Sequence, residues 1–401
     1  MVHWVARQGY AGTTLRDLVR HAGVSKTTFY EHFDSKQECF LSTFDEIASQ
    51  VAERMDDAYR EGGDARGRLT AALMAFMELI VREPEAAMLM AVESLALGEA
   101  SVAHRERGYE AFEAMIRHSF EPPSGEFEVS STTIRAIASG IRGVVYLRLR
   151  RGEIEELPDL VEEMVEWALG YRQVDAESLA LAAAAAAEPR GEPTTVSGSD
   201  DLDWREPPHS PRSRAALTQR ERIVRAVGQL VAENGFQTLS IPKISATAGT
   251  SNQTFYEHFD NKLEAFLTVF EVSLSTALLA ATEAFEAAGD TPSAVGAAIR
   301  ALLEHIAADE LLARVAFFDV LTAGPMALDQ ADAALGSLTA FLRPRVASHG
   351  VGTAAPDTLL QAVGCGTWSV IQHEIAVGRR AALPELGPEL ARVVLAPLAA
   401  R

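Results

Sequence analysis

The hydrophobic positions of this chain recur with the period of an α-helix along most of its length. In residues 219–234 the apolar side chains stand three or four positions apart, which places them on one face of a helix. These positions are Ile223, Ala226, Val227, Leu230 and Val231. The next residue, Gly235, is typical of a helix C-terminus. No stretch alternates between apolar and polar residues for long enough to predict a strand, so we expect an all-α fold.

Three further helices are predicted directly after this one. Their N-caps are Ser240, Ser251, and Asp260 or Asn261, and they cover about residues 241–247, 252–259 and 262–288. A tight turn with Gly249 at its centre joins the first two. Two short helices joined by such a turn form the helix-turn-helix pattern.

The chain contains two copies of one unit. The segment Gly23–Phe44 recurs as Gly249–Phe270 at an offset of 226 residues without a gap, and TFYEHFD is identical in both. The same offset pairs glycines outside this segment, namely Gly9 with Gly235, Gly140 with Gly366, and Gly152 with Gly378. A constant offset over this length indicates that a whole unit was duplicated. Copy 1 therefore repeats the pattern, with Thr14 and Ser25 as N-caps, helices at 15–21 and 27–33, and a long helix from about Lys36.

The rest of each copy is predicted as five amphipathic helices. They cover about residues 66–82, 85–97, 103–120, 129–151 and 157–171 in copy 1, and 292–308, 310–322, 328–348, 356–378 and 384–399 in copy 2. Residues 188–211 are rich in proline and acidic residues and predict a disordered linker. The alanine-rich stretch before the linker is expected to extend the last helix of copy 1.

Five segments follow from these patterns. They are residues 1–44 (helix-turn-helix with a truncated first helix), 45–187 (helical effector and dimerisation domain), 188–211 (linker), 212–270 (second helix-turn-helix) and 271–401 (second effector domain).

The positive charge of this acidic chain is concentrated in two segments. A net charge of −20 argues against a nucleic-acid partner. However, residues 1–36 carry a local +2 and residues 212–262 a local +3, so both helix-turn-helix segments are basic. An acidic body repels the phosphate backbone and would leave only these basic faces able to approach DNA.

The chemistry of DNA recognition is concentrated at the second helix of each helix-turn-helix. Such a helix enters the major groove with its N-terminal side chains at the base edges. The residues at that place are Ser25, Lys26, Thr27 and Thr28 in copy 1, and Ser251, Asn252, Gln253 and Thr254 in copy 2. Lysine suits guanine, and asparagine or glutamine suits adenine.

The run G-x-S-x-x-T-F-Y-x-H-F-x-x-K, present in both copies, resembles the DNA-binding domain of the TetR (tetracycline-repressor) family, and residues 136–160 are similar to that family's last two helices. The resemblance implies a three-helix DNA-binding domain and an effector domain whose small-molecule ligand lowers operator affinity. It also implies dimerisation through the last two helices. By position, the phosphate contacts of the family fall on Thr14, Tyr30, His32 and Lys36, and on Ser240, Tyr256, His258 and Lys262.

Two features depart from the usual family pattern. Two units in one chain predict an intrachain pseudo-dimer, with residues 136–171 packed against 362–400, although a homodimer stays open. Small residues would allow the close approach, namely Ala136, Gly140, Ala362 and Gly366.

The counterparts of Ile223 and Ala226 are missing from copy 1, so either its head is weakened or Met1 is not the true start. Because Lys26-Thr27 differs from Asn252-Gln253, we expect an imperfect palindrome as the operator.

The ligand is not identified by any pattern, and "small and fairly apolar" describes it best. Candidate pocket residues are Met77, Met88, Glu93, Met115, Phe285, Phe317 and Asp319, with core packing as the alternative for the apolar ones. Glu93 and Asp319 occupy matching positions on an otherwise apolar helix. Either they face a ligand or they lie at the surface.

Catalytic, metal and cofactor motifs are absent from the sequence. The run Gly364–Ser369 lacks the third glycine of a dinucleotide loop, and Val377 stands where a zinc motif begun by His373-Glu374 needs its second histidine. Cys39 and Cys365 are interpreted as small buried side chains. We therefore expect a cytoplasmic regulator that is not an enzyme, has no cofactor and does not enter a membrane. The alternatives are an activator, or a helical ligand- or protein-binding module whose DNA-binding heads have decayed.

Overall fold

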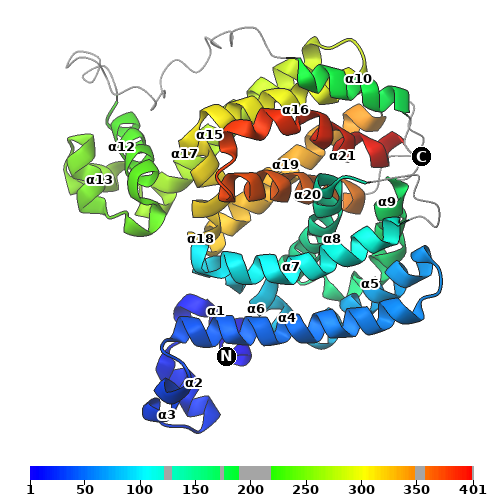
Figure 1. The fold of residues 1–401 in the computed structure, drawn as a ribbon. Helices are drawn as coiled ribbons and strands as arrows, with labels where there is room; N and C mark the ends of the chain where they lie inside the picture. The colour runs from blue at the N-terminus through cyan, green and yellow to red at the C-terminus, as the bar shows by residue number, and fades with distance from the viewer. Residues whose placement is uncertain (122–128, 172–175, 189–217, 348–356, 400–401) are drawn as a thin grey trace. The chain divides into compact units, whose positions relative to one another are not determined.

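The computed structural model describes residues 1–121, 129–171, 176–188, 218–347 and 357–399. Every regular element in these ranges is a helix, which confirms the predicted all-α fold (Figure 1). The chain forms two compact units, of which one comprises Met1–Leu179, Leu335–Ile371 and Arg392–Arg401, and the other Ala180–Ala334 and Gln372–Ala391. Most of the predicted linker, residues 189–211, lies outside the described residues.

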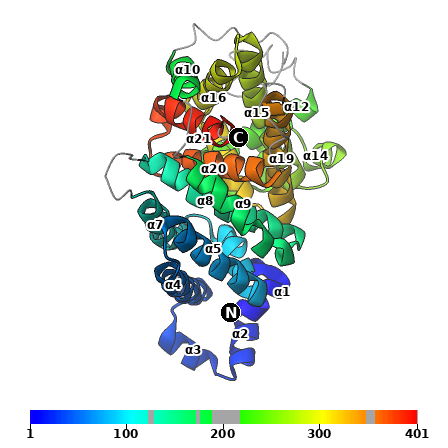
Figure 2. The same cartoon turned by 90° about the vertical axis from the view of Figure 1, so that its right-hand side faces the viewer.

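Copy 1 begins with a helix-turn-helix followed by a long helix. The elements are α1 (Val2–Gly12), α2 (Leu15–Ala22), α3 (Lys26–His32) and α4 (Lys36–Glu61). Both predicted N-caps are confirmed, because Thr14 forms a capping box with Asp17 and the Ser25 hydroxyl accepts the N–H of Thr28. Gly23 ends α2 with a φ of 68°, a conformation that favours glycine. In Figures 1 and 2, α2 and α3 lie beyond the N-terminal end of α4.

Copy 2 repeats this order. The elements are α12 (Gln219–Asn234), η4 (Phe236–Thr238), α13 (Ile241–Ala248), α14 (Asn252–His258) and α15 (Lys262–Ala287). Ser251 and Asn261 cap α14 and α15 as predicted. Ser240 occupies the N-cap position of α13, but its side chain makes no capping hydrogen bond. One reason is that Pro242 removes the N–H of the second helical residue, which such a cap would otherwise bind.

The first helix of copy 1 is short, as its sequence indicates. Its regular part ends before Gly9, which has a φ of 72°, just as α12 ends before Gly235 with a φ of 76°. At the offset of 226 residues, Val2 corresponds to Gly228. Residues 219–227 of α12 therefore have no counterpart in α1.

The effector part of copy 1 continues with α5 (Ala65–Arg82), α6 (Pro84–Ala91), η1 (Glu93–Leu97), α7 (Glu99–Phe120), α8 (Ser131–Arg151), η2 (Ile154–Glu156), η3 (Pro158–Leu160), α9 (Val161–Gly170) and α10 (Ala176–Ala187). Copy 2 has α16 (Thr291–Ala308), α17 (Glu310–Arg314), η5 (Val315–Asp319), α18 (Val320–Thr322), α19 (Pro325–Ala347), α20 (Asp357–Ala376), η6 (Arg380–Leu386) and α21 (Gly387–Ala399). The helices predicted at 85–97 and 310–322 are each interrupted, by a 3₁₀ segment in copy 1 and by a π-helical turn in copy 2.

The alanine-rich stretch is helical, but the prediction that it extends the last helix of copy 1 is wrong. Helix α9 ends at Gly170, and glycine is a poor helix former. The stretch forms the separate helix α10, which packs on α16. A Cβ atom added to Gly296 would lie 2.1 Å from the carbonyl oxygen of Ala182, and Arg300 donates to the carbonyl oxygens of Ala186 and Ala187 at 3.1 and 3.2 Å.

Helices α8 and α20 approach closely at the predicted small residues. A Cβ atom on Gly140 would lie 2.5 Å from the carbonyl oxygen of Ala362, and one on Gly366 would lie 2.4 Å from that of Ala136. These distances leave no room for a side chain. All four residues belong to the first compact unit, which thus combines helices from both copies.

A buried hydrogen bond links the two copies within the same unit. The hydroxyl of Tyr171 donates to the carbonyl oxygen of Val393 at 2.9 Å, and Tyr171 is buried. Burial raises the pKa of this phenol far above its usual value. The end of copy 1 and helix α21 are therefore joined by a directed contact as well as by apolar packing.

Helix α15 is the one described helix whose length and apolar composition would also suit a membrane span. Its side chains include Phe266 and Phe270, both buried, and it packs against α12 and α16. Core packing accounts for this apolar content.

Candidate DNA-binding interface

Each copy presents a short helix with polar side chains at its start. We call α1–α3 the first head and α12–α14 the second head. Within them Ser25, Lys26 and Thr27 are exposed and Thr28 is half-buried, and Ser251, Asn252, Gln253 and Thr254 repeat this arrangement. The candidate base-contacting residues of each copy therefore lie together at the N-terminus of α3 or α14.

The first and fourth of these residues already form hydrogen bonds with each other at the N-terminus of the helix. In α3 the hydroxyls of Ser25 and Thr28 lie 3.0 Å apart, and the Ser25 hydroxyl accepts the Thr28 N–H at 3.0 Å. Ser251 and Thr254 have the same two contacts at the same distances. The two middle residues of each set differ between the heads and carry the exposed hydrogen-bonding groups.

Buried aromatic residues hold the opposite face of each short helix. Phe29 is buried against Leu18 and Val19 of α2, and Phe255 is buried at the same position of the second head. Burial of one face fixes the rotation of the helix, so that its polar tips point away from the domain core.

Tyr30 and Tyr256 stand exposed beside these anchors. Their exposed fractions are 55% and 58%, which is unusual for a large aromatic side chain. Each ring packs edge-on against the neighbouring buried phenylalanine, at centroid distances of 5.6 and 5.7 Å. The rings are thereby oriented, and their hydroxyls are available at the surface.

The other candidates for phosphate contacts differ in exposure and in the hydrogen bonds that they make within the protein. His32 is exposed, whereas His258 is half-buried with Nε2 3.4 Å from the Gln219 side-chain oxygen. The Thr14 hydroxyl donates to Asp17 in the capping box at 2.5 Å. Ser240 is half-buried at the start of α13.

Lys36 and Lys262, which the resemblance assigns to phosphate contacts, are half-buried and donate to backbone carbonyl groups of their own head. The ammonium group of Lys36 donates to the carbonyl oxygens of Tyr10 and Thr13, both at 2.8 Å. Lys262 donates to that of Leu239 at 3.0 Å. Burial lowers the pKa of Lys36. Both lysines satisfy carbonyl groups at the junction between the first two helices of their head.

Arg220 and Arg222 are basic residues of the second head. The sequence predicted no individual contact for either of them, only the basic charge of residues 212–262. The Arg222 guanidinium donates to the Gly249 carbonyl at 3.4 Å, and that of Arg220 lies 5.1 Å from the ring centroid of Phe259. Both lie in the part of α12 that has no counterpart in the first head.

Glu93 is half-buried and Asp319 is buried, and each accepts a backbone N–H group from its own head, while a ligand-facing role for either stays a prediction. A carboxylate oxygen of Glu93 accepts the backbone N–H of Tyr10 at 2.7 Å. A carboxylate oxygen of Asp319 accepts that of Phe236 at 3.0 Å. Burial raises the pKa of Asp319, and this outweighs the lowering effects of the Phe236 N–H and of Arg314. Both acids join an effector domain to its DNA-binding head.

The remaining pocket candidates lie in or near the effector cores. Met77 and Phe317 are buried, and Met88, Met115 and Phe285 are half-buried. Their role in a ligand pocket stays a prediction.

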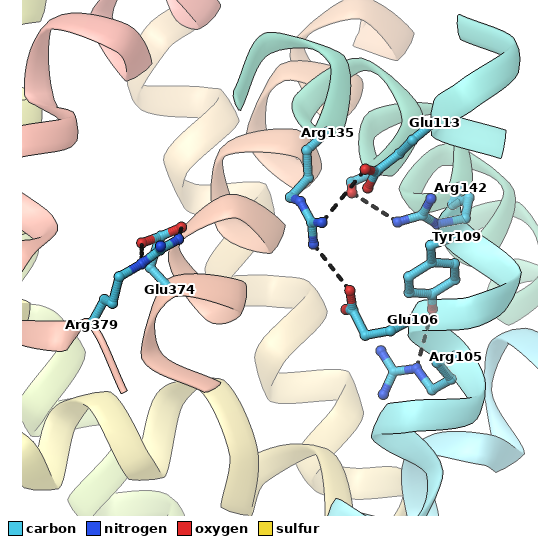
Figure 3. A network of polar contacts seen from close by, with 9 residues as sticks. Arg105, Glu106, Tyr109, Glu113, Arg135, Arg142, Glu374 and Arg379 are labelled. Atoms are coloured by element: carbon cyan, nitrogen blue, oxygen red, sulfur yellow. Dashed lines mark hydrogen bonds and ion pairs between the residues drawn. The ribbon is translucent and has the colours of Figure 1, made fainter. Parts of the chain in front are cut away.

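The effector domain of copy 1 contains a polar network between α7 and α8 (Figure 3). Arg135 pairs with Glu106 at 3.1 Å and with Glu113 at 3.5 Å, and the Arg142 guanidinium lies 3.5 Å from the ring centroid of Tyr109. The positions of this network in copy 2 are occupied by different residues, namely Asp332, Leu335, Thr339, Gln361 and Trp368. The two effector domains have therefore diverged in polarity.

Cys39 and Cys365 are half-buried thiols. Among the described residues, no group of three or more histidine, cysteine, aspartate or glutamate side chains is placed to hold a metal ion.

Comparison with protein families identifies the heads. The model of the tetR family of bacterial regulatory proteins matches residues 4–43 and 223–269. These ranges include α2, α3, α13, α14 and both lysines described above. The tandem arrangement deduced from the sequence is thus also seen in the family match.

Two curated relatives are regulators. The chain is 29% identical over 126 residues to the HTH-type transcriptional activator FasR of Mycolicibacterium smegmatis, covering 27% of this chain and 58% of the relative. It is 26% identical over 92 residues to the fatty acid metabolism regulator protein of Bacillus subtilis, covering 23% of this chain and 47% of the relative. The matches thus span about half the length of these relatives.

One solved structure is also similar, the fatty acid degradation regulator FadR from Bacillus halodurans. It has a TM-score of 0.39 and 19% sequence identity, and the match covers 45% of this chain and 95% of that chain.

Proposed function

Because the chain is a tetR-family protein that carries the family's DNA-binding domain twice, we propose that it is a sequence-specific transcription regulator acting on DNA in the cytoplasm. The observation that carries this proposal is the repeated geometry of α3 and α14. Each helix presents hydrogen-bonding tips at its N-terminus, is anchored by a buried phenylalanine, and stands beside an exposed tyrosine. This arrangement suits base contacts from the tips and phosphate contacts from the tyrosine.

The two heads of one chain form the reading pair. The close packing of α8 on α20 and the Tyr171–Val393 hydrogen bond support an intrachain pseudo-dimer in place of the usual homodimer. Identical heads read identical half-sites, whereas Lys26-Thr27 and Asn252-Gln253 offer different groups to the bases. The operator is therefore an imperfect palindrome with unlike half-sites.

The regulator is a repressor that a small, fairly apolar ligand releases. This part rests on the family resemblance and on the largely apolar effector domains. The name of the Bacillus subtilis relative refers to fatty acid metabolism, so fatty acids are the first ligands to test. Because copy 2 has other residues at the positions of the α7–α8 polar network, the two effector domains are expected to differ in ligand affinity.

Selection of duplexes from a random DNA pool tests the central part of this proposal. We expect a consensus with two unlike half-sites, and a steep fall of affinity as the salt concentration rises. Lys26→Ala should relax only one half-site and Gln253→Ala only the other. A perfectly symmetric consensus would contradict reading by both heads.

A second candidate function is a helical ligand- or protein-binding module with decayed heads. The net charge of −20 favours it, because an acidic chain is repelled by the phosphate backbone of DNA. Absence of binding to any duplex at low salt, with normal ligand binding, would establish this alternative.

A further inference from the structure

The same contact joins the effector domain to the head in both copies. The hydrogen bond from the Tyr10 N–H to Glu93 and the one from the Phe236 N–H to Asp319 both span 83 residues of sequence. The two acids are themselves related by the offset of 226 residues. Two copies that differ at most other polar positions have thus kept a carboxylate here, with a change from glutamate to aspartate.

The backbone of each head is shaped to offer this N–H group. Gly9 and Gly235 have φ values of 72° and 76° and both have a ψ of 165°, which turns the chain sharply out of the first helix. The next N–H, of Tyr10 or Phe236, consequently points away from the helical ladder. A Cβ atom on Gly235 would lie 3.1 Å from the Asp319 carboxylate, so the glycine also allows the close approach.

The effector domain is also irregular at the corresponding place. Glu93 begins the 3₁₀ segment η1, and Asp319 ends the π-helical turn η5. Interruptions of this kind are frequent at functional positions in helices. Each break lies at the residue that carries the acid.

In copy 2 an arginine supports the acid within the effector domain, and a second hydrogen bond joins this domain to the head. Asp319 is only 8% exposed, and its other carboxylate oxygen pairs with Arg314 at 3.0 Å. The side chain of Gln237 donates to the Thr322 carbonyl at 2.8 Å. In copy 1, Met88 and Ala11 occupy the positions of Arg314 and Gln237 and cannot make these bonds.

We propose that Glu93 and Asp319 are positioning residues, each of which helps to fix the orientation of one DNA-binding head on its own effector domain by accepting a backbone N–H of that head. This inference rests on the proposed function, in that both heads bind one operator. A head held in one orientation on its own effector domain tolerates fewer half-site distances than a loosened head, because each inserted base pair also rotates one half-site about the duplex axis. A loosened head tolerates other distances.

A spacing series tests the proposal, using the full chain and the duplex that the wild-type chain selects from a random pool. Operators with one or two base pairs added to or removed from the centre are compared with the selected one. We expect the wild type to prefer the selected spacing by at least about tenfold, comparable to the effect of a mismatched base pair. Asp319→Ala should reduce this preference to about threefold or less, mainly by weakening binding to the selected spacing. Its affinity for a single half-site should not change.

Two further variants separate positioning from mere stability. Asp319→Asn keeps an oxygen that accepts the Phe236 N–H and should restore the spacing preference. Asp309→Ala removes another buried carboxylate, which caps α17 through the Leu312 N–H at 3.0 Å and lies ten residues before Asp319. This control should lower the thermal unfolding temperature and leave the preference intact.

Hydrogen–deuterium exchange reports the bond itself without DNA. In Asp319→Ala, a peptide containing Phe236 should exchange at least about tenfold faster, because its N–H has lost its acceptor. Peptides from α14 should be unaffected. Unchanged exchange at Phe236, an unchanged spacing preference in Asp319→Ala, or an equal loss in Asp309→Ala would each overturn the positioning role. If the wild-type chain selects no duplex at all, the proposed function itself fails, and the exchange result still shows whether the bond exists.

Discussion

If α3 and α14 bind DNA as proposed, two kinds of side chain share the recognition. Ser25 and Ser251 accept backbone N–H groups and so start their helices, which leaves base reading mainly to the residues that follow. Tyr30 and Tyr256 are held edge-on by buried phenylalanine rings. A head built in this way separates specificity from general affinity.

Replacement of single residues in the second head should expose this division. Gln253→Ala is expected to relax specificity at one operator position by about 1–3 kcal/mol, because it removes a contact to a base. Tyr256→Ala should weaken binding to all sequences alike, because phosphates are the same in every sequence. Binding titrations against a set of single-base operator variants measure both effects.

Gln229→Ala is the matched control for these variants. Gln229 is exposed on α12 and pairs with Glu233 at 3.0 Å, away from the start of α14. If Gln253→Ala and Tyr256→Ala bind as the control does, the second head does not read DNA.

The buried carboxyl of Asp319 should make stability depend on pH with a definite sign. Burial raises its pKa above the ordinary value of 3.8 despite the Phe236 N–H and Arg314. Its contribution to stability is therefore fully present below about pH 3.8 and is lost as the pH rises through the raised pKa. The difference in thermal unfolding temperature between the wild type and Asp319→Asn should thus move in favour of the variant between pH 3.5 and 7, a window set roughly by linkage. A shift in favour of the wild type over this range would contradict it.

At the scale of helices, α8 and α20 pack closely because Gly140 and Gly366 have no side chain at their contact. Gly366 lies where an added Cβ would meet the Ala136 carbonyl at 2.4 Å, and backbone atoms cannot move aside as a flexible side chain can. The two helices are thus in contact only because both are narrow at this place.

Widening α20 at this point should separate the two helices. Gly366→Ala is expected to destabilise the protein by about 1–3 kcal/mol, the usual cost of overpacking. Gly170→Ala is the control, since a Cβ added at the end of α9 would meet nothing within 4 Å. Thermal unfolding of both variants measures the effect, and equal unfolding temperatures would show that α8 and α20 do not pack as described.

Local patterns in the sequence were sufficient to predict most helices and their caps. The apolar period of α12 and the hydroxyl or amide caps of α14 and α15 are local signals, and the structure contains all three helices. The alanine-rich α10 was assigned to the wrong neighbour because alanine on every side defines no buried face. Its partner, α16, lies far away in sequence.

The contacts of Glu93, Asp319, Lys36 and Lys262 could not be predicted from periodicity. Each satisfies a backbone group between 23 and 83 residues away, and such a partner leaves no mark on the local pattern. One signal was nevertheless present. The pair Gly9 and Glu93 recurs as Gly235 and Asp319 at the offset of the duplication. This recurrence indicates that the glycine and the acid take part in the same contact.

At the scale of the whole molecule, duplication has produced two heads of unequal construction. The second has a longer first helix, an acid that pairs with Arg314 of its own effector domain, and a hydrogen bond from Gln237 to the Thr322 carbonyl. The first has a shorter helix, the Glu93 contact, and a contact of His3 Nδ1 with a Glu85 carboxylate oxygen at 3.5 Å. A homodimer cannot show this asymmetry, because its heads are identical. On the proposed function, this asymmetry predicts that the two half-sites are bound with unequal strength.

The mass of the protein–operator complex tests the central claim most directly. Sedimentation equilibrium of the chain with the duplex that it selects should give one chain per operator, because a single chain supplies both heads. A complex of two chains on an operator of two equal half-sites would contradict the account, since each chain would then contribute only one head.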